Sequence, residues 1–207
     1  MFTRSGMLAV LILLTAAAAP ERVAAVAAPG DPSREQLQHL LITSQDLEAV
    51  TKMSWVALPL EVRYPAGPAG TAASSGCPGM DNAVLANNTG LLDSGVQPFH
   101  TKAGDFLEET IAYDKSAKEH VQQLGLAIQA CPVMIFTDGP PIEVKPIDLG
   151  ETVAGFRAYI GGISRSVVLA AAYGDYVIEL IFSDRDYPDS FYKALLRAAY
   201  YRVDNPS

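Results

Sequence analysis

The side chains that could support nucleophilic catalysis are two serines and three histidines. Ser164 and Ser166 lie in the segment 162–166, which has a first glycine but lacks the second glycine of a nucleophile elbow. The three histidines fall in separate predicted elements: His39, His100 and His120. A catalytic triad needs its members within hydrogen-bond reach of one another, and the sequence shows no such set. We therefore predict that the protein is not an enzyme, with a hydrolase as the less favoured alternative.

Acidic and sulfur side chains also raise the question of a metal site. Asp184, Asp186 and Asp189 cluster after an apolar run. The glycine and the terminal glutamate of an EF-hand loop are missing, so we assign these aspartates to turns and helix capping. Two cysteines and three scattered histidines have no zinc-ligand spacing. There is no glycine-rich phosphate loop either, and we predict no metal and no cofactor.

The first 28 residues have the pattern of a secretory signal peptide. Arg4 precedes a 13-residue apolar run from Met7 to Ala19, and small residues dominate up to Ala28. Such a run is shorter than the roughly 20 residues that span a bilayer. We expect cleavage between Ala18 and Ala28, and a mature protein in the cell envelope or outside the cell with no stable membrane span. An uncleaved anchor is the alternative.

Composition limits the size of the fold and the class of partner. The chain has 207 residues, 49% of them hydrophobic, which is enough for one domain with a core, over residues 33–207. The formal net charge is −8 and the basic residues are scattered. This argues against nucleic acid or an anionic membrane as a partner. In an exported protein the two cysteines, Cys77 and Cys131, predict one disulfide, and two separate buried thiols are the alternative.

The densest strand-like stretch runs from Thr152 to Phe182. Two glycine-containing turns, Gly161-Gly162 and Gly174-Asp175, separate three apolar runs and predict a three-stranded antiparallel meander. Placing the second turn at Gly174-Asp175 sets Tyr173 opposite Tyr176 and puts eight side chains on one face: Val167, Leu169, Ala171, Tyr173, Tyr176, Ile178, Leu180 and Phe182. A slip of one residue would turn that whole set away, so the register should be well specified.

The second face of the meander is also apolar near its centre, and it must be covered. Its members are Val168, Ala170, Ala172, Val177 and Ile181, with Glu179 opposite Ala170. One interpretation is that helices pack closely onto the alanines. The sharper hypothesis is that small side chains leave a groove for an apolar ligand. On that hypothesis Arg157, Tyr159, Ala170 and Glu179 are the ligand-binding residues, with Ala170 in the groove and the other three at its rim.

The remaining elements complete an α+β class, a central antiparallel sheet with helices packed on it. Two short helices are expected at residues 33–42 and 45–52, a long one at 115–130 and a closing one at 188–201. Trp55 is expected to be a core anchor. A strand is best defined over Phe106–Tyr113, and it carries Glu109 on the same face as Leu107 and Ile111. We expect this strand near a sheet edge, where the glutamate reaches water.

The order of these features resembles the extracellular sensor domain of the mycobacterial PknH-type serine/threonine kinases and related actinobacterial secreted proteins and lipoproteins. The features are an exported leader, the sequence Leu40-Leu41-Ile42-Thr43 before an acidic short helix, Trp55, a long helix ending at Cys131, a glycine-reversed meander and a closing helix. The resemblance covers about residues 33–204 and implies a sheet with packed helices, a cleft and an unidentified ligand. Cys77 and Cys131 match one disulfide of that family, whereas its second bridge has no cysteines here.

These observations together predict a secreted, sensor-like domain that binds a small molecule or an envelope component without catalysis. The kinase domain and the spanning helix of the kinases have no counterpart in this sequence, so a free-standing binding protein is expected. A protein–protein interaction module with an extracellular partner is the alternative. An exposed apolar patch or a stable dimer would favour it.

Overall fold

The computed structural model describes residues 30–61, 75–77, 79–80, 92–136, 139–183, 185 and 187–206. The helices in this part are α2 (Arg34–Gln38), α3 (Ser44–Thr51), α5 (Ala117–Gln129) and α6 (Asp189–Asp204). The strands are β1 (Trp55–Ala57), β2 (Leu92–Asp93), β3 (Gln97–Thr101), β4 (Phe106–Tyr113), β5 (Val133–Met134), β6 (Ile142–Pro146), β7 (Val153–Ile160), β8 (Ile163–Tyr173) and β9 (Tyr176–Ser183). The predicted signal peptide, residues 1–28, lies outside the described residues.

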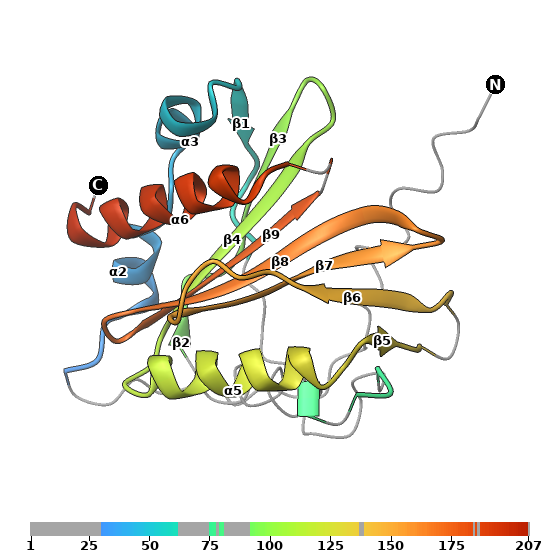
Figure 1. Cartoon of the computed structure of the whole chain (residues 1–207). Coiled ribbons are helices and arrows are strands. Elements are labelled where there is room, and N and C mark those ends of the chain that lie inside the picture. The colour runs from blue at the N-terminus through green and yellow to red at the C-terminus, as the bar shows by residue number, and fades with distance from the viewer. Residues whose placement is uncertain are drawn as a thin grey trace.

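The strands form one antiparallel sheet with helices on both faces, which confirms the predicted α+β class (Figure 1). The strand order is β1-β3-β4-β9-β8-β7-β6-β5, and β2 pairs with β4 beside this path. Helices α2, α3 and α6 lie on one face of the sheet, and α5 lies on the other (Figure 1). Each face therefore has its own hydrophobic core. None of the helices among the described residues is long and apolar enough to cross a membrane.

The predicted meander is confirmed as β7, β8 and β9. Tyr173 lies opposite Tyr176, and Gly174 in the turn between them has a φ of 58°, a conformation that glycine adopts without steric cost. All eight side chains predicted to share a face belong to the α6-side core or pack against it. The period-two alternation of a strand and a two-residue turn are enough to determine this register.

Phe182 is the centre of an aromatic cluster at the start of α6. Its ring is 1% exposed, and it meets four other rings at centroid distances of 5.3 to 6.1 Å: Trp55, Tyr187, Phe191 and Tyr192. All four contacts are edge-to-face. Three are with rings of α6 or the segment before it, and the fourth, with Trp55, connects β1 to the cluster. Trp55 is 3% exposed, which confirms it as a core anchor.

The two N-terminal helices begin within one residue of the predicted positions, and each starts at a capping box. Ser33 caps α2 together with Gln36, and Thr43 caps α3 together with Asp46. The first helix ends at Gln38, four residues earlier than expected, because the chain turns through residues 39–42 to reach the next cap. The backbone amide of Ile42 in this turn donates instead to a side chain of the sheet. We call residues 39–43 the α2–α3 junction.

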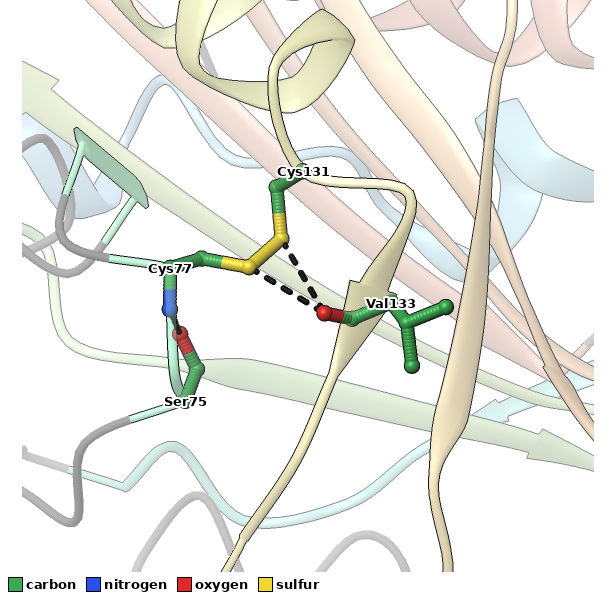
Figure 2. The surroundings of a disulfide bond; sticks show 4 residues. All are labelled: Ser75, Cys77, Cys131 and Val133. Carbon is green, nitrogen blue, oxygen red and sulfur yellow. Dashed lines mark hydrogen bonds between the residues drawn. A yellow bond between two sulfur atoms is a disulfide. The ribbon is translucent and has the colours of Figure 1, made fainter.

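The disulfide between Cys77 and Cys131 joins the end of α5 to the segment 75–77 (Figure 2). The two Cα atoms are 5.7 Å apart, and both sulfur atoms lie near the carbonyl oxygen of Val133, at 3.3 and 3.7 Å. Helix α5 buries four side chains of one face against the sheet: Ala117, Val121, Leu124 and Ile128. The bridge therefore fastens the segment before β2 to the α5 side of the molecule.

Candidate ligand-binding site

The structure divides the four residues predicted to bind a ligand between the two faces of the sheet. Ala170 lies in the core beneath α5, and Glu179 is its cross-strand partner. Arg157 pairs with Val167, which belongs to the α6-side core. Cross-strand partners share a face, so Arg157 points to the side opposite Ala170. The four residues do not line one groove, which corrects the predicted arrangement.

Helix α5 covers the small side chains of the second face. Ala170 is 4% exposed, and Ala154 and Ala172 beside it are also buried. A methyl group built on Gly125 of α5 would meet the Cβ atom of Ala154 at 3.7 Å, an ordinary van der Waals contact. Glycine at this position brings the helix close to the sheet. The close packing of a helix onto the alanines, the first of the two interpretations, is what the structure has.

An Ala170→Phe variant is expected to destabilise the fold by about 1–3 kcal/mol, because the ring has no space between β8 and α5. Chemical denaturation of the purified protein measures this loss. Ala103→Phe is the matched control, since Ala103 is exposed in the turn between β3 and β4 and should change stability by less than about 0.5 kcal/mol. An unchanged unfolding free energy for Ala170→Phe would instead indicate open space over the alanines.

Arg157 and Tyr159 lie on the α6 side, where both take part in contacts with neighbouring elements. The Arg157 guanidinium donates to the Tyr187 carbonyl at 2.7 Å and lies 3.3 Å from Asp189. It also lies over the ring of Tyr192, 5.4 Å from its centroid. Lys145 lies 4.2 Å from the centroid of the Tyr159 ring. Arg157 therefore holds the start of α6 against the sheet.

The candidate catalytic residues remain on separate elements. Ser164 and Ser166 are on β8, whereas His100 is on β3, His39 follows α2 and His120 is on α5. His120 Nδ1 forms a short hydrogen bond with the buried carboxylate of Asp114, whose other oxygen accepts the Ser116 amide at 2.8 Å. Asp184 and Asp186 lie outside the described residues. In the described part of the chain, no three His, Cys, Asp or Glu side chains gather as a possible metal site.

Glu109 is an acidic residue on an apolar face of β4, as predicted, but the predicted position of its strand is wrong. We expected its strand near a sheet edge, but β4 lies between β3 and β9, and Glu109 is fully buried in the α6-side core. Its Oε2 atom accepts the backbone amide of Ile42 at 2.7 Å. Its Oε1 atom has no hydrogen-bond partner within the described segments. The prediction failed because the later strand β9 covers the edge of β4.

Burial raises the pKa of Glu109 to about 8, from an ordinary value of 4.5. The Ile42 amide lowers this pKa, the Asp46 carboxylate raises it, and the Arg202 guanidinium lowers it. Partial burial acts to raise the pKa of Asp46, but hydrogen bonds from Thr43 and Arg202 hold it below its ordinary value. At neutral pH the core therefore contains an uncharged carboxyl group next to an ionised Asp46–Arg202 pair.

An open pocket of about 430 Å³ lies where α2, the start of β9 and the residues after α6 meet. Six residues line it: Pro32, Gln36, His39, Leu40, Tyr176 and Pro206. The Tyr176 ring is held by an edge-to-face contact with Tyr113, at 5.8 Å between centroids. Its volume lies within the range of roughly 300–1,000 Å³ usual for small-molecule sites.

The pocket is open to solvent, and its lining combines apolar and polar side chains. Its walls are apolar and aromatic, and Gln36 and His39 add hydrogen-bonding groups. No Asp, Glu, Cys, Ser or Thr is among the residues that line it. Sequence reasoning missed this site because its walls come from three distant segments, residues 32–40, Tyr176 and Pro206. No local pattern links these segments.

The fold is similar to a solved structure, the crystal structure of the extracellular domain of PknH from Mycobacterium tuberculosis. The superposition has a TM-score of 0.57 with 11% sequence identity, and it covers 84% of this chain and 97% of that chain. No protein-family model matches the sequence, and no curated protein matches it. The likeness spans nearly the whole PknH domain, and it shows that the two chains share a fold.

Proposed function

We propose that this protein is an extracellular, sensor-like domain that binds a small molecule or a cell-envelope component and catalyses no reaction. The observation that carries the proposal is the shared fold with the extracellular domain of PknH over 97% of that domain. The disulfide between Cys77 and Cys131 supports an oxidising compartment, since such bridges persist outside the cytosol. The secretory leader predicted in residues 1–28 supplies the route of export.

The ligand site in this proposal is the pocket beside α2. Tyr176, Leu40 and the two prolines offer an apolar surface, and Gln36 and His39 can orient polar groups. A molecule with a ring to lie against Tyr176, a few hydrogen-bonding groups and little net charge fits this lining.

A protein–protein interaction module is the alternative function, and the distribution of apolar surface argues against it. The exposed large apolar side chains of the described residues are Val56, Leu58, Leu126, Val133, Ile135, Ile163 and Tyr201. They are divided among β1 and the residue after it, β5 and the residue after it, α5, β8 and α6, and β1 and β5 lie at opposite ends of the sheet. A protein interface usually concentrates such residues in one patch.

Native mass spectrometry of the mature protein, secreted by an actinobacterial host, tests the proposal. We expect a discrete added mass on the wild-type protein. Tyr176→Ala should weaken its retention about fivefold, because an aromatic contact contributes about 1 kcal/mol. His39→Ala, at an exposed position of the same pocket, should weaken it and change the unfolding free energy by less than about 0.5 kcal/mol.

Tyr159→Ala is the matched control, since it removes the same side chain from the site predicted by sequence. Loss of the added mass in Tyr159→Ala alone would move the ligand site to the Arg157 side of the sheet. A wild-type protein that carries no added mass and forms a stable complex with a second protein would overturn the proposal in favour of the interaction module.

A further inference from the structure

We propose that the protonation state of the buried Glu109 carboxyl group controls the position of the α2–α3 junction, and through it the position of the α2 wall of the pocket. We call Glu109 and its hydrogen bond with the Ile42 amide the latch. The latch is argued from Glu109 and its surroundings alone. Only its effect on ligand binding depends on the proposed function.

The position of Glu109 gives the carboxyl group no access to solvent. It lies in the middle of β4, between Gln97 of β3 and Leu180 of β9, and its exposed fraction is 0%. One of its oxygens accepts the Ile42 amide, and the other has no partner among the described residues. A buried carboxylate is usually stabilised by several hydrogen bonds, and this one has a single bond to offset its desolvation.

The backbone amide of Ile42, which donates to Glu109, belongs to the junction. Ile42 is followed directly by Thr43, the N-cap of α3. The Thr43 side chain is hydrogen-bonded to Asp46. Leu40, two residues before Ile42, is part of the pocket wall. The hydrogen bond from Ile42 therefore fixes the end of α2, the start of α3 and one side of the pocket relative to the sheet.

The charged groups that act on Glu109 come from two helices. Asp46 of α3 disfavours ionisation of Glu109, and Arg202 of α6 favours it. These two groups are bound to each other at 2.8 Å, so the net effect of the pair on Glu109 is small. The neighbouring strands contribute Gln97 and Leu180. Helix α2 contributes Leu37 to the same core, the junction contributes Leu40, and none of these side chains titrates.

Proton loss from Glu109 leaves a charge that the present surroundings do not stabilise. Strand β4 cannot move to expose this charge to water, because it is hydrogen-bonded to β3 on one side and to β9 on the other. The α2–α3 junction is a short turn outside the sheet, and Leu40, Leu41 and Ile42 in it are buried in the same core. Its movement would admit water to the carboxylate. The hydrogen bond from the Ile42 amide favours the ionised form of Glu109, but the desolvation of the charge is the larger effect. The junction and the α2 wall of the pocket are therefore held in place while Glu109 is protonated, and ionisation drives the junction away so that water reaches the carboxylate.

Hydrogen–deuterium exchange of the ligand-free mature protein tests the latch. In the wild type, the protection factor of the Ile42 amide is expected to fall at least about tenfold between pH 6 and pH 9, after correction for the intrinsic pH dependence of exchange. In Glu109→Gln, which stays neutral, it should change less than about twofold over the same range. Glu108→Gln is the matched control, because Glu108 is the adjacent residue of the same strand and points to the other face.

Three outcomes would overturn the latch: a pH-independent wild type, an unchanged pH dependence in Glu109→Gln, or its loss in Glu108→Gln. If Glu109→Gln does not fold, the carbon-13 signal of the Glu109 carboxyl group in the wild type decides. A midpoint in the ordinary range near pH 4.5 would overturn the latch, and one near pH 8 would support it. Because no ligand is present, these results are independent of whether the pocket binds one.

Discussion

The Glu109→Gln variant is expected to lose a large part of the pH dependence of stability that the wild type has. The pKa of Glu109 in the folded state, about 8, is above its ordinary value of 4.5. The folded chain therefore holds a proton that the unfolded chain has released. The stabilisation of the protonated form is fully present below about pH 4.5 and is lost progressively as the pH rises to about 8. Over that window the wild type should lose roughly 5 kcal/mol relative to Glu109→Gln.

Urea denaturation of both proteins at a series of pH values measures this difference. The quantity to compare is the unfolding free energy of the wild type minus that of Glu109→Gln, because the other carboxyl groups contribute equally to both. We expect this difference to be largest in acid and to become constant above about pH 8. Glu108→Gln, on the half-exposed face of β4, should follow the wild type. A difference that is the same at every pH would mean that Glu109 has the same pKa in the folded and the unfolded chain.

The Phe182→Ala variant is expected to be destabilised by about 3–5 kcal/mol, the range observed when a buried phenylalanine is removed. The ring of Phe182 is 1% exposed and sits between β1 and α6. Its loss leaves a cavity lined by four aromatic rings, which come from β1, the segment before α6 and α6 itself. These rings cannot all move inward at once, so little of the cavity should be filled by relaxation.

Fluorescence of Trp55 reports this loss, because it is the single tryptophan of the chain and its ring lies 6.0 Å from that of Phe182. We expect a lower denaturation midpoint followed at this probe. Phe191→Ala is the matched control, since it deletes a half-buried ring of the same cluster and should cost roughly half as much. Equal losses for the two variants would show that the centre of the cluster is not at Phe182.

Local order in this fold follows directly from the sequence. The meander register follows from period-two alternation and the Gly174 turn, and the buried stripe of α5 follows from its helical spacing. Both N-terminal caps, Ser33 and Thr43, are also visible in the sequence. Each of these features depends on residues that are close together in the chain. The α+β class follows once the elements and their order are known.

The face on which a side chain lies depends on contacts between distant elements. Arg157 and Ala170 both belong to the meander, but their faces are opposite because Arg157 pairs with Val167. The register of β7 also shifts at Ala158 and Tyr159, which no periodicity reveals. The groove hypothesis combined residues from both faces because the sequence does not show how β7 pairs with β8. Which face α5 would cover was likewise outside the reach of a local pattern.

The burial of Glu109 and the pocket beside α2 were decided only by the tertiary structure. The sequence shows a glutamate among apolar residues of a strand. It does not show that β9 pairs with β4 on the side opposite β3. Nor does it show that residues 32–40, Tyr176 and Pro206 meet. Short-range patterns specify helices, turns and register, because their interactions are between neighbours in the chain. Strand order and helix placement depend on the burial of whole faces, and these set the environment of Glu109 and the walls of the pocket.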